Sequence, residues 1–154
     1  MPEISFYHFT CEPLEKALPR LMEKVYSSNK HAVIMAADTE QVEALNKSMW
    51  TYATMAFVPH GSQADGFADQ QPIWLTTKEE NPNNAEILVL TNGQQTDFVE
   101  KFSRCLDVFD GNDRNAVQQA SERVSTYKNK GYDVTYWLQG ERGNWIKQDI
   151  ERIL

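Results

Sequence analysis

The sequence predicts a three-layer α/β/α protein, in which helices cover both faces of a mostly parallel central sheet. Short continuous apolar runs, such as residues 32–36, are typical of strands that are buried on both faces. Longer segments with apolar residues at helical spacing separate these runs. Strands and helices that alternate in this way form one layered domain, and the length of 154 residues also predicts a single domain.

The first strand is predicted at residues 4–9, where side chains alternate within an aromatic-rich run. Thr10 is the expected cap of the helix that follows, and Pro13 is tolerated in the first turn of that helix. The apolar positions of this helix are Leu14, Leu18, Leu21 and Val25.

A second helix is predicted after the strand at residues 32–36. Asp38, followed three residues later by Gln41, is typical of a capping box. The apolar stripe of this helix consists of Val42, Leu45 and Met49. Trp50 falls about 100° off that stripe by helical geometry, so we expect its ring near the edge of the helix.

The remaining elements follow from apolar runs and the turns between them. They are a short strand at 57–58, a polar loop at 59–71, strands at 73–75 and 86–90, a short helix at 96–102, a strand at 105–109, a helix from 114 that ends at Gly131, and a strand at 132–138. We therefore assign the domain to residues 1–138. Residues 139–154 form a C-terminal extension, predicted as a short amphipathic helix from its apolar residues Trp145, Ile146, Ile150 and Ile153.

The net charge of the chain is −7, but the charged residues are unevenly distributed along the sequence. An acidic chain does not attract phosphate backbones as a whole, so direct nucleic-acid binding is disfavoured. From residue 114 onward basic side chains exceed acidic ones, which suits a small acidic partner better than a duplex. Two cysteines without a CxxC pattern, no signal peptide and no long apolar run predict a cytoplasmic protein without a membrane span.

Phosphate-binding motifs are absent from the sequence. The turn after the first strand, residues 9–13, has no glycine and carries an acid where a phosphate would lie. No GxxxxGK[ST] pattern occurs. We therefore expect no nucleotide cofactor and no catalytic activity.

Candidate catalytic and metal-binding residues are few. His8 and Cys11 lie three apart, but a zinc site needs about four ligands, so a packed histidine and thiol are expected instead. Asp107, Asp110 and Asp113 cluster without calcium-loop spacing, and we expect them to form turns.

Two aromatic residues suggest a protein-binding surface. Trp50 lies off the apolar stripe of its helix, and Phe57 follows shortly after. Packing in the core is the equal alternative for both. An exposed aromatic pair is what a binding hot spot uses.

The sequence resembles the chi subunit of bacterial DNA polymerase III over residues 3–138. The residues that carry the resemblance are Phe6 and Tyr7, the run 32–36 before Asp38, residues 43–50 ending in Trp50, Phe-Val-Pro-His at 57–60, residues 86–90, and residues 127–132 before the last strand. The spacing between Trp50 and the Phe-Val-Pro-His run is the most specific part.

This resemblance implies a non-catalytic subunit of the clamp-loader complex on a fold related to nucleotide-binding domains. It implies two partners, the psi subunit and the acidic, Phe-ended tail of single-stranded-DNA-binding protein. A repair helicase is a further partner in place of psi. The implied psi-binding residues are Trp50, Phe57 and His60.

The implied tail site lies on the last helix, where we expect Arg123, Tyr127, Lys128 and Lys130 to contribute. Arg123 is expected to run its stem along apolar surface while its charged head stays in water. Family members carry an arginine, an aromatic residue and a lysine where this chain has Ser121, Val124 and Ser125. These departures predict weaker tail binding.

Two other classes of function remain open from the residues alone. One is a small enzyme that uses Cys11 or the loop with Asp107, Asp110 and Asp113. The other is a nucleotide-binding regulator on the same fold.

Overall fold

The computed structural model describes residues 2–10, 12–51, 60–63 and 65–150. Its elements are β1 (Glu3–Phe9), α1 (Leu14–Ser27), β2 (Ala32–Met35), α2 (Thr39–Thr51), β3 (His60–Ser62), the 3-10 helix η1 (Ala68–Gln70), β4 (Ile73–Thr76), β5 (Ile87–Leu90), the 3-10 helix η2 (Asp97–Lys101), β6 (Arg104–Asp110), α3 (Arg114–Asn129), β7 (Asp133–Gln139) and β8 (Trp145–Gln148).

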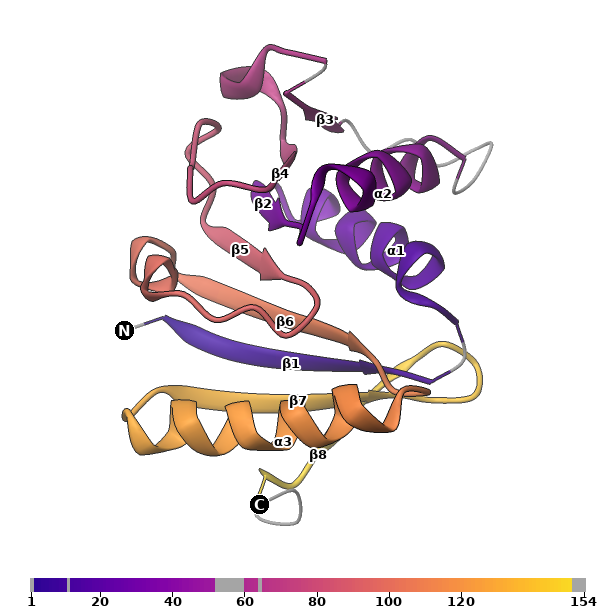
Figure 1. Cartoon of the computed structure of the whole chain (residues 1–154), viewed down its shortest axis with the longest axis vertical. Coiled ribbons are helices and arrows are strands. Elements are labelled where there is room, and N and C mark those ends of the chain that lie inside the picture. Colours follow the sequence, from indigo (N-terminus) through magenta and orange to yellow (C-terminus); the bar gives the residue numbers. More distant parts are fainter. Residues whose placement is uncertain (1, 11, 52–59, 64, 151–154) are drawn as a thin grey trace.

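The strands form one eight-stranded sheet in the order β3-β4-β2-β5-β6-β1-β7-β8 (Figure 1). Every neighbouring pair is parallel except β7 and β8, which are antiparallel. The prediction of a mostly parallel α/β sheet is therefore confirmed.

Helices pack on both faces of this sheet, because successive side chains of a strand point to opposite sides. Tyr7 and Phe9 of β1 pack in one hydrophobic cluster with α1 and α2. Ile4 and Phe6 pack in a second cluster with α3, which lies along β7 in Figure 1. The predicted three layers are thus α1 and α2, the sheet, and α3.

The two predicted helix caps have different outcomes. The carboxylate of Asp38 accepts a hydrogen bond from the backbone nitrogen of Gln41 at 2.8 Å, so Asp38 caps α2 as predicted. The prediction for Thr10 is wrong, since α1 begins at Leu14 with Pro13 at the cap position. The Thr10 hydroxyl instead donates to the carbonyl oxygen of Gln139 at 2.8 Å and joins β1 to the end of β7.

The predicted loop at residues 59–71 contains a short strand. Residues 60–62 form β3, which pairs with β4 at one edge of the sheet. The predicted strand at 57–58 lies outside the described residues. A segment of three residues is too short for its hydrophobic pattern to distinguish a strand from a loop.

The helix predicted in the C-terminal extension is wrong for residues 145–148. These residues form β8, which pairs antiparallel with β7. The Trp145 ring packs edge-on against Tyr7, with ring centroids 4.9 Å apart, and lies 5.4 Å from the ring of Phe9. The extension therefore adds a strand to the sheet and a side chain to the first hydrophobic cluster.

Candidate functional site

Trp50 reaches the surface at the C-terminal end of α2. It is 56% exposed, whereas Val42, Leu45 and Met49 of the same helix are buried. The predicted position of Trp50, off the apolar stripe, is confirmed. A large exposed ring held on a rigid helix is suited to anchor a partner protein.

His60 lies beneath this ring. It is buried at the start of β3, and its ring centroid lies 5.0 Å from that of Trp50. One ring nitrogen of His60 lies 3.3 Å from the carbonyl oxygen of Asn46, one turn before Trp50 on α2. His60 therefore supports the position of Trp50 more than it offers a surface of its own. Phe57, the third residue predicted here, lies outside the described residues.

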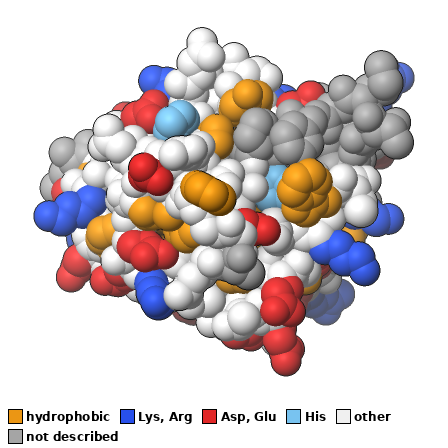
Figure 2. All heavy atoms as spheres, turned by 90° about the horizontal axis from the view of Figure 1, so that it is seen from above, with side chains coloured by type: hydrophobic (Ala, Val, Ile, Leu, Met, Phe, Trp, Pro, Cys, Tyr) orange, Lys and Arg blue, Asp and Glu red, His pale blue; other side chains and the backbone are white. Residues whose placement is uncertain are grey.

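Phe67 is a second exposed aromatic residue at this end of the molecule, and the sequence analysis missed it. It is 70% exposed. Its loop is fastened to α2 by Asp65, whose carboxylate accepts hydrogen bonds from the side chain of Asn46 and the backbone of Ser62. Figure 2 shows this end of the molecule, with hydrophobic side chains at the surface near a histidine. An aromatic residue inside an otherwise polar loop was the available signal.

Arg123 is placed differently from the prediction. Its guanidinium makes two hydrogen bonds to the Asp107 carboxylate, at 2.7 and 2.8 Å, and lies 5.9 Å from the centroid of the Phe6 ring. The side chains of Arg123 and Asp107 are 6% and 1% exposed. The expectation that the head of Arg123 stays in water is therefore wrong, and so is the turn assignment of Asp107, which lies inside β6.

Burial raises the pKa of Asp107, although the hydrogen bonds and charge of Arg123 act in the opposite direction. Desolvation therefore outweighs the attraction of the ion pair at this site.

The other residues predicted for tail binding divide into buried and exposed ones. Tyr127 was expected to contribute to the tail site, but its side chain is buried against the sheet, as is that of Val124. Lys128 and Lys130 are exposed at the C-terminal end of α3. Of the predicted tail site, these two lysines are the side chains left accessible to an acidic peptide.

A crevice lies where nucleotide-binding folds hold their ligand. β1 and β6 are neighbours, yet the helices that follow them cover opposite faces of the sheet. A cavity of about 370 Å³ at the ends of these strands is lined by Glu15, Asp110 and Asp113. Arg123 also lines it, but its guanidinium is paired with Asp107. A phosphate would therefore meet carboxylates here.

The candidate catalytic residues are engaged separately. The Asp110 carboxylate accepts the backbone N–H of Asn112 in the turn before α3, and the Asp113 carboxylate caps α3 by accepting the backbone N–H of Asn115. A ring nitrogen of His8 lies 2.7 Å from the hydroxyl of Tyr136. Cys11 lies outside the described residues. Within the part of the chain that is described, no three potential metal-ligating side chains come together.

Among the described residues, no helix has the length and apolar character needed to cross a membrane. Fold and surface define an α/β domain of the mostly parallel, doubly covered class, with an acid-lined crevice and an exposed tryptophan at one end.

Comparison with known proteins identifies the family within this class. The family model described as DNA polymerase III chi subunit, HolC, matches residues 1–135. A Rickettsia prowazekii protein named "Probable DNA polymerase III subunit chi" is 32% identical over 154 aligned positions, which cover 96% of this chain and 92% of that protein. The DNA polymerase III subunit chi of Pseudomonas aeruginosa is 28% identical, over 73% of this chain and 78% of its own length. The one of Escherichia coli is 22% identical, over 79% and 82%.

The chain belongs to the family of DNA polymerase III chi subunits. It is therefore a DNA replication protein with partners inside the polymerase holoenzyme. The family model ends at residue 135, but the alignment with the Rickettsia protein covers 96% of the chain and so extends into β8.

Proposed function

We propose that this chain is a non-catalytic, cytoplasmic subunit of the clamp-loader complex that links the polymerase to other proteins at the replication fork. The observation that carries the proposal is the exposed ring of Trp50 on a rigid helix, away from the core stripe. The acid-lined crevice supports the same view, because the usual ligand of such a fold would be repelled there.

The psi subunit is the proposed partner for the surface around Trp50. Tryptophan is among the residues most enriched at binding hot spots, where a few side chains supply most of the affinity. His60 holds the ring from below, and Phe67 extends the exposed aromatic area along the neighbouring loop. A repair helicase is the alternative occupant of this surface, in place of psi.

Replacing Trp50 with alanine is expected to weaken psi binding about 30-fold, the effect of losing one hot-spot side chain of about 2 kcal/mol. Thermal unfolding should stay close to that of the wild type, because the ring is largely exposed. Calorimetry with purified psi from the same organism measures the first, and circular dichroism the second.

Tyr26→Ala is the matched control, since Tyr26 is a 39% exposed aromatic residue on α1. It should leave psi affinity unchanged. Equal affinities for wild type and Trp50→Ala would refute the assignment of this surface. Binding of a repair helicase, but not of psi, to wild type and its loss in Trp50→Ala would identify the alternative occupant.

We further propose that Lys128 and Lys130 receive the acidic tail of single-stranded-DNA-binding protein. A carboxylate-rich tail needs basic donors, and these two side chains are exposed at the end of α3. Ser121 and Ser125 stand where family members carry further contacts, and Arg123 is paired with Asp107. The tail should therefore bind weakly.

Lys128→Ala is expected to weaken binding of a labelled acidic, Phe-ended peptide by up to about fivefold, since exposed charge contacts are weak. A fluorescence titration at two salt concentrations measures this, and higher salt should weaken wild-type binding. Lys78→Ala, in the loop after β4, is the control and should change nothing. Binding that ignores both Lys128 and salt would place the tail elsewhere.

A further inference from the structure

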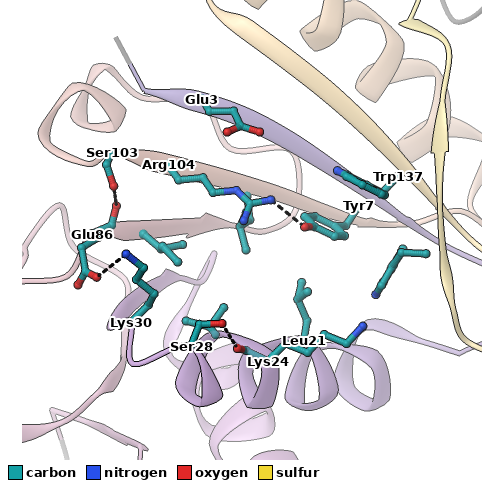
Figure 3. A pocket seen from close by; sticks show the side chains of 14 residues that line it. Glu3, Tyr7, Leu21, Lys24, Ser28, Lys30, Glu86, Ser103, Arg104 and Trp137 are labelled. Atoms are coloured by element: carbon teal, nitrogen blue, oxygen red, sulfur yellow. Dashed lines mark hydrogen bonds and ion pairs between the residues drawn. The ribbon is translucent and has the colours of Figure 1, made fainter.

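A cavity of about 540 Å³ opens on the α1 side of the sheet, at the amino ends of β1, β5 and β6 (Figure 3). It is bounded by the C-terminal half of α1 and by β7 and β8. Its volume lies in the range of small-molecule sites. None of the residues proposed above for psi or for the acidic tail lines it.

The floor and one wall of this cavity are apolar. Leu21 and Val25 of α1 and Leu106 of β6 contribute the aliphatic part. The ring of Tyr7 stacks near-parallel to that of Trp137, with 6.5 Å between centroids, and meets Trp145 edge-on at 4.9 Å. Aromatic walls of this kind accept a flat, apolar group.

Arg104 brings a fixed positive charge to these rings. Its Nη2 donates to the Tyr7 hydroxyl at 3.0 Å and to the Ser5 hydroxyl at 3.1 Å, and its Nε lies 3.3 Å from the same Ser5 oxygen. Within the described chain no carboxylate lies within ion-pair distance of this guanidinium, and its Nη1 donates to no residue. The cation is thus held in place by hydroxyl groups, and the Glu3 carboxylate is linked to it only through the Ser5 hydroxyl, which donates to Glu3 at 3.4 Å.

Two further hydrogen-bond donors accompany Arg104. The Tyr7 oxygen accepts from Arg104, so its own proton is left to donate, and burial raises the pKa of this hydroxyl. The indole nitrogen of Trp137 is buried and has no hydrogen-bond partner among the described residues. Figure 3 shows the Arg104 guanidinium at the hydroxyl end of Tyr7, with Trp137 beside the Tyr7 ring. An anionic oxygen beside Arg104 would accept hydrogen bonds from its Nη1 and from the Tyr7 hydroxyl, which have no acceptor among the described residues.

The remaining charges at the rim favour a singly charged anion. Lys24 is exposed at this rim, and the Nζ of Lys30 lies 3.8 Å from a carboxylate oxygen of Glu86. Glu3 and Glu86 line the same cavity, and the C-terminal end of α1 carries partial negative charge. A phosphate dianion meets more repulsion in this setting than a carboxylate does.

We propose that this cavity binds a small aromatic carboxylate. The ring lies against Tyr7, Trp137 and Trp145, and the carboxylate accepts from Nη1 of Arg104 and from the Tyr7 hydroxyl. The cavity shares no lining residue with the proposed psi and tail sites.

N-acetylphenylalanine is the probe, because it carries a ring and a single carboxylate. The chain has four tryptophans, so a nitrogen-15 correlation spectrum gives four indole signals, which Trp→Phe variants assign. The signals of Trp137 and Trp145 should shift and saturate with a Kd on the order of 1 mM, the affinity expected for so small a ligand. The signals of Trp50 and Trp74 should not move.

The controls separate charge from ring binding. N-acetylphenylalaninamide, which lacks the carboxylate, should bind at least tenfold more weakly, and adenosine monophosphate should cause no shift. Arg104→Gln should weaken binding about tenfold, as expected for a lost charged hydrogen bond. Arg114→Gln, with the same change of charge at the exposed start of α3, should have no effect. Tyr7→Phe tests the hydroxyl separately if Arg104→Gln does not fold.

Three outcomes would overturn the proposal. The first is the absence of any shift at concentrations on the order of 10 mM, well above the expected Kd. The second is equal binding of the acid and the amide, and the third is tighter binding of adenosine monophosphate than of the acid.

Discussion

Asp107→Ala is expected to lower the free energy of unfolding by about 3–5 kcal/mol, because it leaves the guanidinium of Arg123 charged and unpaired inside the domain. The two side chains are 1% and 6% exposed and share two short hydrogen bonds. Urea unfolding followed by circular dichroism measures the change. Glu12→Ala removes the ion pair with Arg20, whose side chains are 21% and 41% exposed, and should cost less than about 1 kcal/mol.

The double variant Asp107→Leu/Arg123→Met tests the reason for this loss. Burial raises the pKa of Asp107 although Arg123 acts to lower it. The attraction between the two charges therefore serves mainly to offset the cost of removing them from water, and it adds little net stability. The double variant should therefore lie within about 1 kcal/mol of the wild type. A double variant as unstable as Asp107→Ala would show that the pair itself stabilises the domain.

Trp145→Ala is expected to lower the free energy of unfolding by about 2–3 kcal/mol, somewhat less than for a fully buried tryptophan. Its ring packs on Tyr7 and Phe9, which lie on the interior strand β1. Ile146→Ala is the control, because Ile146 is the next residue of β8 and is 46% exposed. It should change stability by less than about 0.5 kcal/mol. If Trp145→Ala changed the free energy of unfolding as little as Ile146→Ala, β8 would add little to the core.

Most of the fold could be predicted because its signals are local. Residues 32–35 and 87–90 are continuous apolar runs, and such runs identify buried strands without knowledge of their neighbours. The cap at Asp38 depends on two residues three positions apart. The sequence analysis missed β8, although it pairs with β7 across a short turn. The packing of Trp145 on Tyr7 of β1 could not be predicted, since it joins segments far apart in the sequence.

The candidate sites divide in the same way. The exposure of Trp50 follows from its position off the apolar stripe of its own helix. The burial of Arg123 depends on Asp107 in β6, and the basic side chains of α3 gave no sign of that pairing. A lone acid within the apolar run 105–109 was the available hint that a buried partner was needed. The cavity beside Arg104 draws residues from six elements and has no signature in the sequence.

The position of β1 between β6 and β7 delays completion of the fold during protein synthesis. Glu3 of β1 stands opposite Arg104 of β6 on one side and Asp133 of β7 on the other. After its synthesis, β1 therefore waits for about 100 further residues before its first neighbouring strand exists, which takes about 5–20 s at usual translation speeds. During that interval β1 has neither of its neighbouring strands, so its apolar side chains and unpaired edges are exposed to aggregation. The same long-range pairing raises the contact order and slows refolding of the complete chain.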